Sequence, residues 1–341
     1  MDTVIAIIYN VAILFMMMIP GFLLKKLKMI PDGFGKGLSN LVLYIAQPAL
    51  VFLAYLKDFS KEILINSIYV LVISIVAHAL FAAVAIPVFK KAPDAKARML
   101  KFATIFSNAA FMGIPLISVV LESTYPGATL YASIYNITFN LFLWSLGVAI
   151  CTKGRDINCD GVDDYREVSS LTPDSDANDT VKNSSGSILK AILHPITIAA
   201  LLGLVFFILP INGYVPSIMV EALTMLKNLV APLSMTVIGI RLADMTFRGM
   251  LRDTYMYIFL VLRHVALPLL ILGLIKLLAL VGFEIPYIAS MVSIILAACP
   301  AASSATMFAE KFSCDAIYVS RLVAVSTLLS IITMPLIILL I

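Results

Sequence analysis

Ten predominantly apolar runs alternate with short polar segments along the chain. The runs lie near residues 3–24, 37–56, 63–89, 102–121, 128–151, 188–209, 216–240, 254–278, 287–309 and 315–340. A helix of about 20 apolar residues crosses the hydrocarbon core of a bilayer. The pattern therefore predicts an all-α membrane protein with ten transmembrane helices.

Two of these runs, the fourth and the ninth, are interrupted by polar and helix-breaking residues. The fourth contains Ser107–Leu116, which reads SNAAFMGIPL, and the ninth contains Cys299–Lys311, which reads CPAASSATMFAEK. Broken backbone at membrane depth is tolerated only where it is buried in protein or lines a cavity. Interrupted segments in corresponding positions of two halves are typical of a transporter's substrate site.

One long polar segment, residues 153–187, divides the chain into two parts with five apolar runs each. Its many Asp, Asn, Ser and Thr residues are typical of a flexible linker. Because five is an odd number, the two parts must cross the membrane in opposite orientations, as inverted repeats do. We expect one inverted repeat over residues 1–152, a linker over 153–187 and a second repeat over 188–341.

Composition and charge support insertion in the membrane. The chain of 341 residues is 61% hydrophobic and only 13% charged, whereas soluble domains carry about 25% charged residues. Eighteen Lys and Arg residues lie in the loops after the odd-numbered runs, against two, Lys57 and Lys61, in the opposite loops. The positive-inside rule then predicts a protein of the plasma (inner) membrane with a cytoplasmic linker and both termini outside. Because the basic residues are spread between runs, nucleic-acid binding is not expected.

The linker contains a segment with the pattern of a calcium-binding loop. Residues 156–167 read DINCDGVDDYRE and fit D-x-N-x-D-G-x5-E. The oxygen ligands would come from Asp156, Asn158, Asp160, Val162, Asp164 and Glu167. Against this, Asp163 occupies a position that is usually aliphatic, and no second loop accompanies the first. The alternative is an acidic, solvated linker.

The chain resembles the auxin efflux carrier family, which includes bacterial relatives of the plant PIN-type carriers. The resemblance extends over nearly the whole chain except the linker, and the residues that carry it are Pro48-Ala49-Leu50, Asn108, Phe111 to Leu116, Pro232-Leu233, Gly239, Ala298, Pro300, Ala309-Glu310, Asp315 and Pro335-Leu336. It implies a fold like that of Na+/H+ antiporters and bile-acid symporters, with crossed broken helices 4 and 9. It also implies transport of organic anions such as auxins, malate or malonate. A homodimer formed through helices 2 and 7 is expected on the same ground.

The candidate substrate-binding residues lie at the two interruptions and in the eighth run. They are Asn108, Gly113, Pro115, Pro300, Ser303, Ser304 and Arg263. Pro115 and Pro300 are expected to end half-helices, whose exposed N–H groups and positive dipole ends attract an anion. For Asn108 the alternative is interhelical hydrogen bonding, and for the two serines it is helix packing. For Arg263 it is a structural pair with a carbonyl group or with an Asn side chain.

The same runs limit the transport mechanism. The fifth run contains no Asp or Glu, so antiport that depends on a buried carboxylate to carry the proton is disfavoured. Sodium could still bind to amide, hydroxyl and carbonyl oxygens, which leaves a sodium-coupled symporter as an alternative. A membrane sensor controlled by calcium through the linker is a second one. No nucleophile–base pair or metal constellation points to an enzyme, and no cofactor is expected apart from these two ions.

Overall fold

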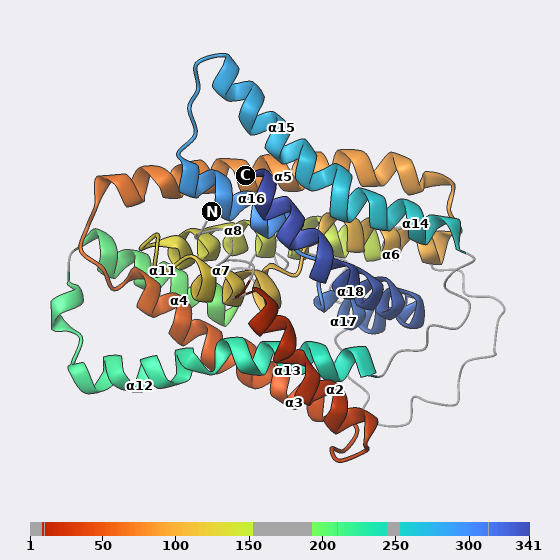
Figure 1. Cartoon of the computed structure of the whole chain (residues 1–341), viewed down its shortest axis with the longest axis horizontal. Coiled ribbons are helices and arrows are strands. Elements are labelled where there is room, and N and C mark those ends of the chain that lie inside the picture. Colours follow the sequence, from red (N-terminus) through yellow and green to blue (C-terminus); the bar gives the residue numbers. More distant parts are fainter. Residues whose placement is uncertain (1–8, 10, 153–192, 210, 244–252, 313) are drawn as a thin grey trace.

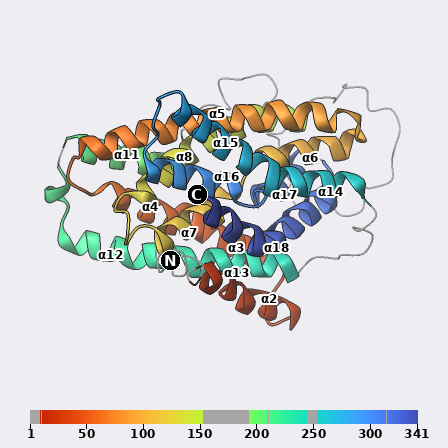
Figure 2. The same ribbon diagram turned by 45° about the horizontal axis from the view of Figure 1, so that its top comes forward.

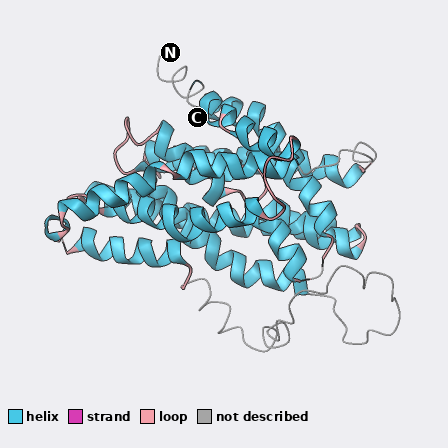
Figure 3. Ribbon diagram, turned by 90° about the horizontal axis from the view of Figure 1, so that it is seen from below, coloured by secondary structure: helices cyan, strands magenta, loops and turns pink. Residues whose placement is uncertain are grey.

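The computed structural model describes residues 9, 11–152, 193–209, 211–243, 253–312 and 314–341. Over these residues every regular element is a helix, apart from one isolated β-bridge between Ser107 and Ala301 (Figure 3). The predicted all-α class is confirmed. The predicted linker, with the six residues of its calcium loop, lies outside the described residues.

The helices follow the apolar runs closely. The first half contains α2 (Met18–Lys26), α3 (Phe34–Leu41), η1 (Val42–Ala46), α4 (Gln47–Tyr55), α5 (Lys61–Val88), η2 (Phe89–Lys91), α6 (Asp94–Ile105), η3 (Ala109–Gly113), α7 (Ile114–Val120), α8 (Ala128–Phe142), η4 (Leu143–Gly147) and α9 (Val148–Thr152). The second half contains α11 (Pro195–Ile208), η5 (Asn212–Tyr214), α12 (Ser217–Asn228), α13 (Val230–Ala243), α14 (Thr254–Val261), η7 (Leu262–Ala266), α15 (Leu267–Leu280), α16 (Tyr287–Ala298), α17 (Ser304–Lys311) and α18 (Ala316–Leu340).

Six continuous helices in the described part of the chain are long and apolar enough to cross a membrane. They are Phe34–Tyr55, Lys61–Lys91, Ala128–Thr152, Ser217–Ala243, Thr254–Leu280 and Ala316–Leu340. Three shorter apolar helices accompany them, Ala109–Val120, Pro195–Ile208 and Tyr287–Ala298. Two of the three adjoin the interruptions, because a helix that is broken at membrane depth provides only half of the span on each side.

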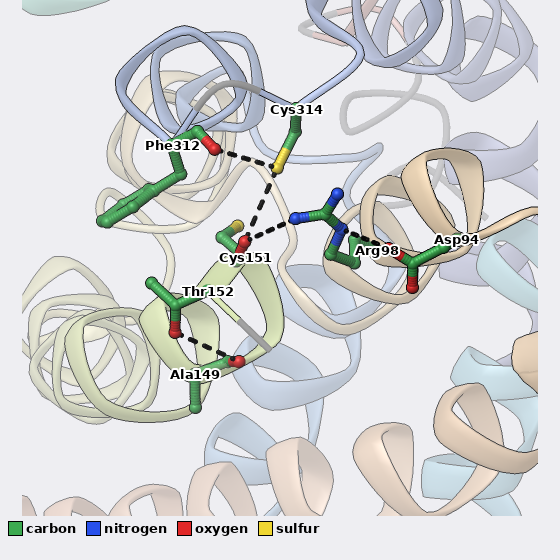
Figure 4. A network of polar contacts seen from close by, with 7 residues as sticks. All are labelled: Asp94, Arg98, Ala149, Cys151, Thr152, Phe312 and Cys314. Carbon is green, nitrogen blue, oxygen red and sulfur yellow. Dashed lines mark hydrogen bonds and ion pairs between the residues drawn. The ribbon is translucent and has the colours of Figure 1, made fainter. Parts of the chain in front are cut away.

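The fourth run begins earlier than its apolar residues predict. The helix α6 starts at Asp94 instead of near residue 102, since its charged first turns are stabilised by partners at one end of the bundle. Arg98 forms an ion pair with Asp94 and donates a hydrogen bond of 3.0 Å to the carbonyl of Cys151. This carbonyl belongs to the last turn of α9, where a cation is favourable, and the Cys314 thiol approaches it as well (Figure 4).

The helices form two groups that lie against each other. In one, which we call the scaffold group, α2 and α3 pack on α13 and α4 packs on α11 and α12. In the other, the crossover group, α5, α6, α8, α14, α15, α16 and α18 pack on one another. Figures 1 and 2 show α2, α3, α12 and α13 on one side of the molecule and α5, α14 and α15 on the opposite side. The interrupted segments lie between these two sides.

Within the scaffold group, α2 and α13 cross at two glycines. A Cβ atom on Gly21 would lie 2.1 Å from the carbonyl oxygen of Thr236, and one on Gly239 would lie 2.0 Å from that of Met18. Small residues let two membrane helices approach to backbone contact. The crossing therefore requires glycine at both positions.

Candidate transport site

The two interruptions meet at the centre of the molecule. Their extended segments form a short antiparallel bridge, in which the Asn108 N–H donates to the carbonyl of Pro300 at 2.7 Å. The Ala302 N–H donates to the carbonyl of Phe106 at 2.9 Å, so the bonds are arranged symmetrically about Ser107 and Ala301. The bridge satisfies backbone groups that would otherwise be unpaired at membrane depth.

Asn108 joins this bridge to the helix that follows it. Its carbonyl accepts hydrogen bonds from the N–H groups of Met112 and Gly113 at 3.1 and 3.0 Å. Its side chain is buried, and the amide nitrogen Nδ2 has no hydrogen-bond partner. A buried N–H donor without a partner is costly, so Asn108 carries donor capacity that the fold itself does not use.

Gly113 and Pro115 lie beyond the break. Gly113 ends the π-helical turn η3, where a Cβ atom would lie 2.4 Å from a methyl carbon of Leu296. Pro115 is the second residue of α7, a position where its missing N–H costs little because the π-turn precedes it. The half-helix thus starts at Ala109, six residues before the position expected from Pro115, because the extended bridge interrupts the helix first.

In the second interruption, Pro300 lies in the extended segment itself, between α16 and α17. Ser303 and Ser304 stand at the start of α17. The carbonyl of Ser303 accepts a hydrogen bond of 2.6 Å from Nη1 of Arg241, a residue of α13. This arginine ties the second interruption to the scaffold group.

Arg263 is completely buried and donates to the ends of both broken helices. Its Nε and Nη2 atoms bond the carbonyl of Cys299 at 2.9 and 2.7 Å, and Nη2 also bonds that of Ala297 at 2.7 Å. Its Nη1 atom bonds the carbonyl of Thr104 at 3.0 Å. These carbonyls belong to the C-terminal ends of α16 and α6, which lack partners within their helices. Arg263 therefore caps both helix ends. This is the pairing with carbonyl groups that the sequence analysis gave as an alternative to substrate binding.

This arrangement decides the electrostatics of the crossover. A helix carries roughly half a negative charge at its C-terminus and half a positive charge at its N-terminus. The guanidinium charge of Arg263 offsets the partial negative charges at the C-terminal ends of α6 and α16. The partial positive charges at the N-terminal ends, at Ala109 and Ser304, are not offset by it. No Asp or Glu is among the buried residues that the structure describes. The centre of the molecule is therefore favourable for a negative charge.

Two residues that the sequence did not place at the site also contact the interrupted segments. The Gln47 amide nitrogen donates to the carbonyl of Ala110, and Arg241 binds Ser303 as described above. Gln47 opens α4 and Arg241 lies near the end of α13, so each half of the scaffold group holds the broken helix of its own half. The signal for Gln47 that the sequence offered was an amide side chain next to Pro48 within an apolar run.

The described residues contain no group of three or more His, Cys, Asp or Glu side chains arranged to hold a metal ion. The structure places Asn108, Gly113, Pro300 and Ser303 around the bridge. Arg263 lies next to the bridge, where it donates hydrogen bonds to the carbonyls of Cys299 and Thr104.

Comparison with known families identifies the class of protein. The family model described as "Membrane transport protein", that of the auxin efflux carriers, matches residues 6–338. The chain belongs to this family. The resemblance noted in the sequence is thereby confirmed, and the protein is an integral membrane transporter that contacts the lipid bilayer. A search of curated proteins gives no significant match.

Proposed function

We propose that this member of the membrane transport protein family is a secondary transporter of a small organic anion. The observation that carries the proposal is the position of Arg263. By capping both C-terminal helix ends, it leaves the two positive N-terminal ends facing the crossover. The Asn108 amide then supplies an unused donor for a carboxylate, and Ser304 and the amide groups at the start of α17 supply others.

The finer architecture belongs to the same proposal. Ten transmembrane segments in two inverted repeats would place α6–α7 and α16–α17 as equivalent broken helices, in an arrangement similar to that of Na+/H+ antiporters and bile-acid symporters. The symmetric bridge about Ser107 and Ala301 and the matching roles of Gln47 and Arg241 support such a repeat. Alternating access would come from rocking of the crossover group against the scaffold group.

A homodimer through the second and seventh predicted helices is part of this proposal. The helix α12 has no fully buried residue, and it exposes Ile218 and Met225 at 77% and 72%. An interface on the scaffold group would let the crossover group move without breaking it. Cysteine cross-links between two copies of α12 should therefore form in membranes, whereas cross-links that form only between two copies of α7 or α17 would contradict the interface.

The test of function is uptake into proteoliposomes that contain the purified protein. We expect accumulation of at least one of radiolabelled malonate, malate or indole-3-acetate, and competition by unlabelled organic anions but not by glycerol or choline. Uptake of a neutral or cationic solute, with no anion transported or competing, would contradict the proposal. The same assay with and without a sodium gradient distinguishes a uniporter or exchanger from a sodium-coupled symporter.

A further inference from the structure

The helix α8 carries polar side chains on two opposite faces, and one of these faces includes side-chain groups that have no hydrogen-bond partner. On the face toward α5, Asn66 Nδ2 donates to the Tyr131 hydroxyl at 3.2 Å and Ser74 Oγ donates to Thr138 Oγ1 at 2.8 Å. His78 on α5 stacks on Phe142 on the same face, and its Nδ1 atom is hydrogen-bonded to the carbonyl of Ser74 at 2.7 Å. These contacts account for the polar groups between α5 and α8.

The other face carries a row of four residues that we call the α8 stripe: Thr129, Ser133, Asn136 and Asn140. Their spacing of four, three and four residues places them on one side of a helix, roughly half a turn away from Tyr131 and Thr138. The Ser133 hydroxyl is hydrogen-bonded to that of Tyr55 at 2.9 Å. Because Tyr55 lies on α4, the stripe faces the scaffold group, which α8 also contacts through α11.

Two residues of the α8 stripe, Asn136 and Asn140, carry side-chain groups that have no partner in the protein. Both amide atoms of Asn136 and Nδ2 of Asn140 make no hydrogen bond, although these residues are only 1% and 4% exposed. Two buried groups of the scaffold group share this property, Oε1 of Gln47 and Oγ1 of Thr197. Buried polar groups are nearly always paired, so a set of unpaired ones along one interface indicates a role other than packing.

The ends of the α8 stripe fit a path across half of the membrane. From Thr129 to Asn140 the helix rises roughly 16 Å, about half of the hydrocarbon thickness. At the Thr129 end, Glu122 accepts the N–H of Thr129 at 2.7 Å and forms an ion pair with Lys57, the second residue after α4. This pair joins the two helix groups at that end. Farther along, α8 packs on η3, next to Asn108.

We propose that the α8 stripe, with Gln47 and Thr197 opposite, is the wall along which the transported carboxylate moves between the crossover and the Thr129 end. The hydroxyl and amide groups would replace the water around the carboxylate. Because they are uncharged, they would solvate the anion without holding it, as a solute path requires. The identity of the solute as an anion rests on the proposed function, whereas the position of the path rests on the stripe alone.

The position is tested by thiol modification. Single cysteines are introduced at residues 133, 136 and 140 of the stripe and at 131 and 138 of the opposite face, in a variant that lacks the four native cysteines and still transports. We expect the anionic reagent 2-sulfonatoethyl methanethiosulfonate to modify the stripe positions at least tenfold faster than the α5-facing ones. Equal rates on both faces, or faster modification of the α5 face, would overturn the proposal. This result does not depend on which solute is carried, so it separates failure of the path from failure of the proposed anion specificity.

A second pair of variants keeps the test independent of folding. Asn136→Leu removes two unpartnered groups, so it should keep or raise the Tm while lowering malonate, malate or indole-3-acetate uptake at least tenfold. The control Thr138→Val removes a satisfied bond on the opposite face, so it should lower the Tm and leave uptake per folded protein unchanged. Wild-type uptake by Asn136→Leu would contradict the proposal. So would a loss of Tm in Asn136→Leu as large as that in Thr138→Val.

Discussion

Individual residues at the crossover are of two kinds: those whose hydrogen bonds hold the broken helices in place, and those whose hydrogen-bond donors are unused. Arg263 belongs to the first class, since its donors are used by the carbonyls of Thr104, Ala297 and Cys299. Asn108 belongs to the second, because its side-chain donor is unused. The sequence predicted that both residues lie at the site, but it could not separate these roles. A buried arginine in an apolar run has the same pattern whether it binds a solute or caps helices.

The first prediction concerns Arg263. Replacing it with Met leaves the carbonyl groups at two helix ends without a donor and removes the charge that offsets their dipoles. Since each hydrogen bond to a charged group contributes about 1.5–3 kcal/mol, we expect Arg263→Met to lose at least ~3 kcal/mol of stability. Arg263→Lys should retain only part of it, because an ammonium group lacks the planar fork.

The measurement is the Tm of the purified variants in detergent, together with anion binding by the fraction that remains folded. A stable Arg263→Met protein that has lost only its affinity for anions would instead identify Arg263 as a direct ligand of the substrate.

At the scale of helices, the apolar runs predicted most of the elements, and the exceptions have a common cause. Helix α6 starts eight residues early because Arg98 in its second turn bonds the carbonyl of Cys151 on α9, far away in the sequence. The break precedes Pro115 by several residues because a bridge to Ala301 interrupts the helix. The sequence contains the residues that make these contacts, but hydropathy carries no information about which distant segment will pair with them.

The second prediction concerns the crossing of α2 and α13. A methyl group on Gly239 would collide with the backbone of Met18, which cannot move aside as a flexible side chain can. We expect Gly239→Ala to destabilise the protein by about 1–3 kcal/mol, the usual cost of overpacking. The matched control is Gly273→Ala in α15, where no atom lies within 4 Å of the added carbon.

Chemical or thermal unfolding of the two variants side by side provides the measurement. Gly273→Ala should be neutral or slightly stabilising, because alanine favours helices over glycine. Equal effects at the two positions would show that the close approach of α2 and α13 is not required.

At the scale of the whole molecule, two groups of helices meet along α8, and a charged pair joins them at the Thr129 end. Burial raises the pKa of the Glu122 carboxyl, but hydrogen bonds from Lys57, from the N–H group and the side chain of Thr129 and from the N–H group of Gly127 outweigh it and hold this pKa below its ordinary value. A pKa that is lowered in the folded state means that the carboxylate stabilises the fold above the unfolded value, about 4.3. This contribution is lost as the pH falls through the folded pKa.

The third prediction follows from that pair. The Tm of the wild-type protein should include a component that decreases as the pH falls below about 4, and this component should be absent in Glu122→Gln. Thermal unfolding at a series of pH values measures both proteins. Identical pH profiles would show that Glu122 contributes nothing as an anion.

The fourth prediction concerns the orientation of the protein in the membrane, which we infer from the distribution of charged residues between the loops. A cysteine introduced at Gly213, between α11 and α12, should react with an impermeant thiol reagent in intact cells. A cysteine at Asp164 in the linker should react only after the membrane is permeabilised. Variants without the native cysteines provide the background, and the reverse pattern would overturn the predicted topology.

The central claim is that the crossover binds an organic anion through Asn108, and one substitution tests it most directly. Asn108→Leu nearly preserves volume and removes an amide donor that has no partner in the protein, so the Tm should change little. Loss of hydrogen bonds to a carboxylate should weaken anion binding or uptake in proteoliposomes at least about tenfold. The control Asn66→Leu, which loses the bond to Tyr131 away from the crossover, should lower the Tm but keep the affinity. Normal uptake by Asn108→Leu, or a loss of uptake that follows only from failure to fold, would contradict this account.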